Sequence, residues 1–149
     1  MIGNVTSGED TDDFYVAQAR QVNLFRAAGG GASRVALGRV IVPLDRADAS
    51  TRRKYLDFAD GRLERTQHPN GPRRTLFPRD LLESTDDILE WLMADPIVRA
   101  VNELRLELPY EFQQEEYRQI LHDFITKIAP ELGWQPHARA IAKPLAALL

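Results

Sequence analysis

The sequence predicts an α+β fold in a single domain over residues 13–149, with a small antiparallel sheet (34–77) followed by a mostly helical, acidic C-terminal half. Three observations predict this class. The run SRVALGRVIVPL is rich in valine and isoleucine and contains a late proline, which is typical of a buried strand. The pair Asp60-Gly61 is a turn signal for a β-hairpin. Apolar residues then recur at helical spacing over residues 112–129.

The N-terminal region is expected to hold a tail and a helix. Residues 1–12 are small, polar and acidic with no apolar period, so we expect a mobile acidic tail. Asp12 or Asp13 can cap a helix that runs from Asp13 to about Ala28. The triple glycine of AAGGGASR ends this helix, because glycine readily adopts the left-handed conformation. A phosphate-binding loop is disfavoured, since no lysine follows the glycines and the expected order is helix, loop, strand.

The next segment has the turn signals of β-structure. Residues 54–67 are predicted to form a β-hairpin that turns at Asp60-Gly61. The loop HPNGP carries a second turn signal, Asn70-Gly71, and the stretch RRTLF after it can add a short strand. Together with the strand over 33–44, these pieces make up the expected antiparallel sheet.

Helices are expected to dominate the C-terminal half. Ser84 and Asp87 resemble a capping box, and Pro96 suits the first position of another helix. In NELRLELP, leucine alternates with charged residues as in a half-buried strand. The apolar end, HARAIAKPLAALL, is predicted as a short helix that packs on its own domain. The alternative is that it is exposed and supports a homo-oligomer or docks on a partner.

Charge is distributed unevenly along this chain of net charge −3. Residues 1–13 hold four acids and no base, residues 14–79 hold thirteen bases and five acids, and residues 80–149 hold six bases and thirteen acids. Such asymmetry indicates binding to nucleic acid or to a charged protein surface. The competing interpretation is that the basic half docks on the acidic helices of the same chain and is neutralised internally.

Several function classes are disfavoured. The chain has no cysteine, which excludes disulfides, thiolate metal sites and a cysteine nucleophile. Its three histidines are scattered, its serines lack a G-x-S-x-G setting, and we expect no metal, no cofactor and no catalytic residue. No run of 18 apolar residues exists and the N-terminus does not resemble a signal peptide. The expected location is therefore the cytoplasm, without membrane association.

These observations favour a non-enzymatic accessory binding protein, of bacterial or phage type because sixteen of its nineteen basic residues are arginine. The basic residues expected to bind nucleic acid or an acidic protein surface are Arg34, Arg39, Arg52, Arg53, Lys54, Arg73, Arg74 and Arg79. The alternative function is an acidic inhibitor or immunity-type protein that covers a basic toxin or nuclease. Its contact residues would be Glu83, Asp86, Asp87, Glu90, Glu111, Glu115 and Glu116.

Overall fold

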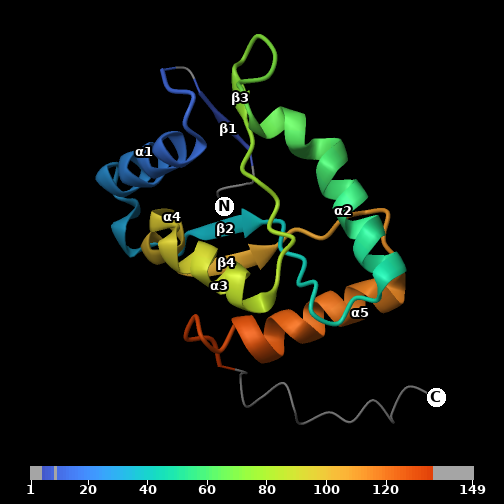
Figure 1. The fold of residues 1–149 in the computed structure, drawn as a ribbon. Helices are drawn as coiled ribbons and strands as arrows, with labels where there is room; N and C mark the ends of the chain where they lie inside the picture. The colour runs from blue at the N-terminus through green and yellow to red at the C-terminus, as the bar shows by residue number, and fades with distance from the viewer. Residues whose placement is uncertain (1–4, 9, 136–149) are drawn as a thin grey trace, which may run out of the picture.

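Two small sheets and five α-helices are found in the computed structural model, which describes residues 5–8 and 10–135 (Figure 1). The predicted α+β class is confirmed. None of the helices in these residues is long and apolar enough to cross a membrane. The terminal helix predicted over residues 137–149 lies outside the described residues.

Helix α1 (Phe14–Ala27) confirms the helix predicted after the acidic N-terminus. The Asp13 carboxylate accepts hydrogen bonds from the backbone N–H groups of Tyr15 and Val16, which satisfies two of the free donors at the helix start. Gly29 has a φ of 98°, in the left-handed region, and one 3-10 turn follows it. The glycine run therefore ends the helix, as predicted.

Replacing Gly29 with alanine is expected to lower the free energy of unfolding by about 1 kcal/mol, because an L side chain is strained at this positive φ. Gly31→Ala is the matched control, since a Cβ at Gly31 meets no atom within 4 Å and its φ is not in the left-handed region. Urea denaturation followed by circular dichroism measures both variants. Equal losses would show that the left-handed residue does not constrain this turn.

The strands pair differently from the antiparallel sheet predicted over 34–77. Strand β2 (Ala36–Arg39) pairs in parallel with β4 (Glu103–Leu106), which is the strand predicted from the alternating leucines. Strand β3 (Thr75–Leu76) pairs antiparallel with β1 (Thr6–Ser7), inside the segment expected to be a tail. Parallel strands require a long crossover, and here α2, β3, α3 and α4 lie between β2 and β4 along the chain.

The β-hairpin predicted over 54–67 is wrong, because these residues lie in helix α2 (Ala49–Leu63) and in the 3-10 turn after it. The Asp48 carboxylate caps α2 by accepting hydrogen bonds from the backbone N–H groups of Ser50 and Thr51, at 2.9 and 2.8 Å.

The Asp60-Gly61 pair is accommodated in the last turn of α2, although a glycine there costs about 1 kcal/mol relative to alanine. The straight-chain arginines and lysine of α2 favour the helix. Its packing favours the same state, since Tyr55 is completely buried and its ring stacks on Phe112 at 4.6 Å between centroids. Core burial thus outweighs the local turn signal.

The helices of the C-terminal half confirm the predicted starts. Helix α3 (Thr85–Ala94) begins after Ser84, whose hydroxyl accepts a hydrogen bond from the backbone N–H of Asp87. Helix α4 (Pro96–Ala100) has its proline at the first position. Helix α5 (Gln114–Asp123) continues into a π-helical segment over 124–128, within the predicted range 112–129.

Residues 40–44, which follow β2, divide the core into two clusters. The side chains of Val40, Val42 and Leu44 pack with Tyr55 of α2, whereas Ile41 packs with α3 and with the π-helical segment that follows α5. This is the two-residue period of an extended chain. The segment 79–83 runs parallel to residues 40–44, with backbone N–H to O distances of 2.8–2.9 Å, so it lies at a defined position beside α2.

Candidate binding groove

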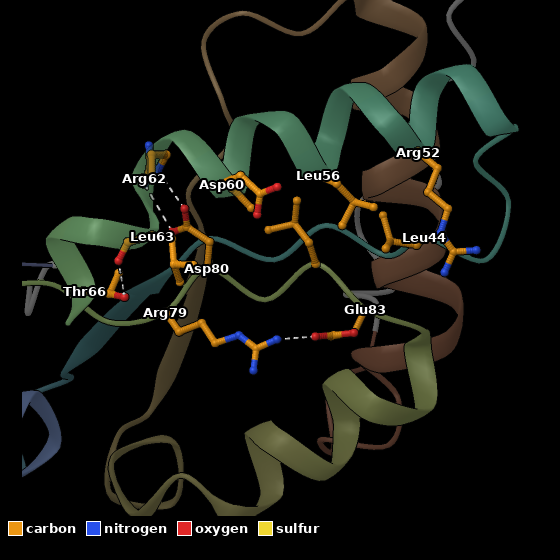
Figure 2. A pocket seen from close by; sticks show the side chains of 12 residues that line it. Leu44, Arg52, Leu56, Asp60, Arg62, Leu63, Thr66, Arg79, Asp80 and Glu83 are labelled. Carbon is orange, nitrogen blue, oxygen red and sulfur yellow. Dashed lines mark hydrogen bonds and ion pairs between the residues drawn. The ribbon is translucent and has the colours of Figure 1, made fainter.

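A groove with a volume of about 460 Å³ lies between helix α2 and the segment 79–83 (Figure 2). It brings together three residues that the sequence singled out, Arg52, Arg79 and Glu83. The buried side chains of Leu44 and Leu82 lie beneath it. The groove is therefore the place where candidate binding residues from separate parts of the chain meet.

One wall of the groove is a stripe along α2. Arg52, Leu56, Asp60 and Leu63 follow one another at intervals of three or four residues, so they share one face of the helix. Leu56 is 40% exposed and Leu63 is 46% exposed. This wall therefore offers apolar surface to an external group, with a cationic side chain at its N-terminal end.

Ion pairs hold the opposite wall in place. The Arg62 guanidinium donates two hydrogen bonds to the buried Asp80 carboxylate, at 2.6 and 3.2 Å, and so ties α2 to the segment 79–83. Arg79 pairs with Glu83 along the rim (Figure 2). Among the described residues, Arg52 has no ion-pair partner at all.

Internal ion pairs engage most of the predicted basic residues. Five of the eight are paired, Arg34 with Glu103, Arg39 with Asp95, Lys54 with Glu116, Arg74 with Asp12, and Arg79 with Glu83. Four of these five acids belong to the acidic half of the chain. Arg52, Arg53 and Arg73 have no ion pair within the part of the chain that the structure describes. Much of the positive charge of the basic half is therefore neutralised by acidic residues of the same chain.

Arg39 departs furthest from the expected surface role. Its guanidinium is buried and donates to the Gly38 carbonyl, to Gln18 and to Asp95, at 3.0, 2.7 and 2.8 Å. Nor do the other basic residues gather on one face of a sheet, because residues 54–67 form a helix rather than a hairpin. Arg73 and Arg74 lie instead in the turn before β3.

The predicted acidic residues form two separate groups. Asp86, Asp87 and Glu90 are exposed on the first turns of α3, and Glu83 precedes them at the groove rim. Glu111, Glu115 and Glu116 lie around the start of α5, where Glu115 pairs with Arg118.

Glu116 is the acid most tightly engaged by its surroundings. Its carboxylate accepts two hydrogen bonds from the Lys54 ammonium, at 2.9 and 2.7 Å, and one from the Gln113 backbone N–H at 2.5 Å. Partial burial acts to raise its pKa, but these donors outweigh burial and hold the pKa of Glu116 below its ordinary value. This carboxylate therefore joins α2 to α5 through its contact with Lys54.

A second charged cluster joins the turn before α2 to α5. The carboxylate of Asp123 is fully buried and accepts no hydrogen bond. Its nearest cationic group is the Arg46 guanidinium, whose Nη1 lies 3.5 Å from Asp123 Oδ1 and 3.1 Å from His122 Nδ1. The His122 side chain itself is exposed.

Sequence reasoning missed the two leucines and Asp80 that complete the groove. The two leucines were predicted to lie in a β-hairpin, in which side chains share one face at a period of two residues rather than at the spacing of a helix. The signal that could have found them is the spacing Arg52, Leu56, Leu63, which places three side chains on one face of a helix. Asp80 carries no local signal, because its role depends on Arg62 from another element.

No protein-family model, no curated protein and no solved structure matches this chain. What the chain binds therefore has to be argued from the residues of the groove and from their charges.

Proposed function

We propose that this chain is a non-enzymatic accessory binding protein that holds an acidic, partly apolar segment of a partner protein in the groove beside α2. The observation that carries the proposal is the α2 stripe, which presents an Arg52 with no ion pair in the described residues next to two exposed leucines. An acidic side chain opposite Arg52 and apolar side chains opposite Leu56 and Leu63 complement this stripe in charge and polarity.

The length of the stripe sets the length of the partner segment. From Arg52 to Leu63 the helix rises about 16 Å, at about 1.5 Å per residue. An amphipathic helix of about three turns covers this distance, with its apolar residues at i, i+4 and i+7. The exposed side chains of Leu56 and Leu63 supply the apolar surface that an apolar anchor on the partner would remove from water.

A nucleic acid is the less favoured occupant. Asp60, Asp80 and Glu83 line the same groove as the arginines, and their carboxylates oppose the continuous row of phosphate groups that a nucleic acid would place along it, whereas the proposed peptide needs an acidic side chain only opposite Arg52. The paired arginines would also have to give up protein carboxylates to reach a phosphate. An acidic peptide needs only one free cation together with apolar contact.

The Arg52→Glu variant tests this proposal against a matched neighbour. The probe is a synthetic peptide of about 15 residues with leucines at i, i+4 and i+7 and glutamates beside them. Reversing the charge at Arg52 is expected to weaken binding at least about tenfold, which corresponds to about 1.4 kcal/mol. Fluorescence anisotropy at low and at physiological salt gives the dissociation constants.

Arg53→Glu is the control, because Arg53 is exposed on the same helix but lines a different hollow, with Glu111 and Phe112. It makes the same charge change and is expected to alter binding by less than about twofold. Equal losses in the two variants would refute the groove and indicate general electrostatic attraction. A labelled oligonucleotide that binds more tightly than the peptide would replace the protein partner with nucleic acid.

The second candidate function, capture of a basic toxin or nuclease, is supported by one observation. Asp86 and Glu90 are exposed one turn apart on α3, and neither has an ion pair within the described residues. A peptide with lysines in place of the glutamates probes this surface. If this candidate is correct, the lysine peptide binds to the chain. Changing Asp86 and Glu90 to lysine is then expected to abolish that binding.

A further inference from the structure

A second cavity, with a volume of about 130 Å³, shares Arg79 with the groove. It lies where Tyr15 of α1 and Trp91 of α3 approach the buried Arg39–Asp95 ion pair. Figure 2 shows Arg79 extending along the lower edge of the groove toward Glu83. The Arg79 side chain therefore borders both spaces.

The size and lining of this cavity suit one side chain. Its volume is well below the roughly 300–1,000 Å³ of small-molecule sites. Its apolar lining includes Leu81 and Leu92, both buried, and Trp91, which is 45% exposed. A half-open apolar hollow of this size is the form that anchor side chains of binding partners fill.

The charges around the cavity favour an aromatic ring. Arg39 and Arg79 line it, and each guanidinium is already paired with a carboxylate, Arg39 with Asp95 and Arg79 with Glu83. The Arg39 guanidinium lies 5.9 Å from the Tyr15 ring centroid, and the Arg79 guanidinium lies 5.5 Å from a Trp91 ring centroid.

Guanidinium groups attract the electron-rich faces of aromatic rings, and neighbouring rings add edge or offset contacts. A cation would have to displace an arginine from Asp95 or Glu83 to gain a counter-charge. An anion would compete with Asp95 for an arginine whose hydrogen bonds are already made inside the protein. A neutral aromatic ring needs neither of these changes.

We propose that this cavity receives one phenylalanine or tyrosine side chain of the partner segment that the α2 groove holds. The inference rests on the proposed function, and it specifies the partner: an aromatic residue follows or precedes the acidic, amphipathic stretch, on the side of Arg79. The aromatic residue anchors the segment, and the groove orients it.

Small probes test the cavity without the groove. N-acetylphenylalaninamide is titrated into the full chain while the indole N–H signal of Trp91 is followed by NMR, with a Trp134→Phe variant used to assign the two tryptophans. We expect a saturable shift of the Trp91 signal, and at least about tenfold weaker binding of N-acetylleucinamide.

A cavity-filling variant locates the probe. Ala94 lines the cavity at the exposed end of α3, so Ala94→Leu fills the space and is expected to abolish the shift. Met93→Leu is the control, because Met93 is exposed on the same helix but does not line the cavity. Should Ala94→Leu alter the circular dichroism spectrum, Ala94→Met fills the same space with a more flexible side chain.

The outcomes separate this inference from the proposed function. If the groove peptide binds but the phenylalanine amide gives no saturable shift, or the leucine amide binds equally well, the aromatic pocket is refuted and the groove remains. If the phenylalanine amide binds and is lost in Ala94→Leu while the groove peptide fails, the pocket stands and the partner must be sought by its aromatic residue alone.

Discussion

Changing Asp95 to asparagine is expected to lower the free energy of unfolding by about 3 kcal/mol, because it leaves the Arg39 guanidinium buried without a counter-charge. The two side chains are 3% and 8% exposed, and Nη2 of Arg39 lies 2.8 Å from Oδ2 of Asp95. The other carboxylate oxygen accepts a hydrogen bond from the backbone N–H of Ile97 and caps α4. Asparagine keeps an oxygen that can accept this hydrogen bond. The loss of stability is therefore caused by the missing negative charge.

Urea denaturation measures this loss as a lower midpoint at an unchanged slope. Asp86→Asn is the matched control, because Asp86 is exposed on α3 and is expected to change stability by no more than about 0.5 kcal/mol. Adding Arg39→Met to the Asp95→Asn variant removes the stranded charge and is expected to recover part of the lost stability. A loss below about 1 kcal/mol in Asp95→Asn would contradict the dependence of Arg39 on this one acid.

Raising the pH from 10 to 12 is expected to remove about 2 kcal/mol of stability through Tyr55 alone. Burial, reinforced by the negative charges of Glu116, Asp123 and Asp48, raises the pKa of Tyr55 from 10.0 to about 12. The folded chain therefore keeps the phenolic proton in a pH range where the unfolded chain has lost it. The contribution is complete below pH 10 and is lost as the pH rises toward 12.

Tyr55→Phe isolates this effect, because it keeps the ring that stacks on Phe112 and removes the ionisable group. Urea denaturation of both proteins at pH 9, 10, 11 and 12 is expected to show a steeper loss of the free energy of unfolding in the wild type. Burial also raises the pKa of Tyr15, so Tyr15→Phe shows how much of the remaining loss that residue causes. If Tyr55→Phe loses stability as steeply as the wild type, Tyr55 is not the titrating group.

Local chemistry was enough to predict where several helices start and stop. Asp13 and Ser84 satisfy free N–H groups at helix starts, and Pro96 needs no N–H at the position it occupies. Gly29 adopts the left-handed conformation that ends α1. Each of these helix boundaries depends on residues only a few positions apart in the chain. The amino-acid sequence was therefore sufficient to predict them.

Contacts and strand pairings between segments far apart in the sequence could not be predicted in the same way. Asp60-Gly61 is a turn signal by itself, but the burial of Tyr55 against Phe112 keeps its segment helical. Strand β2 was found in the sequence, whereas its parallel partner, β4, lies more than sixty residues away. The pairing depends on which crossover the helices allow, and no local pattern encodes that choice.

For the candidate site, too, some features could be predicted from the sequence and others depend on the tertiary structure. The sequence by itself determined that basic residues concentrate before position 80 and acidic residues after it, because composition does not depend on folding. Only the tertiary structure decided that Arg39 is buried against Asp95 while Arg52 stays without an ion pair in the described residues, beside two exposed leucines. The physical reason is that an ion pair forms over a few ångströms, and the fold sets those distances.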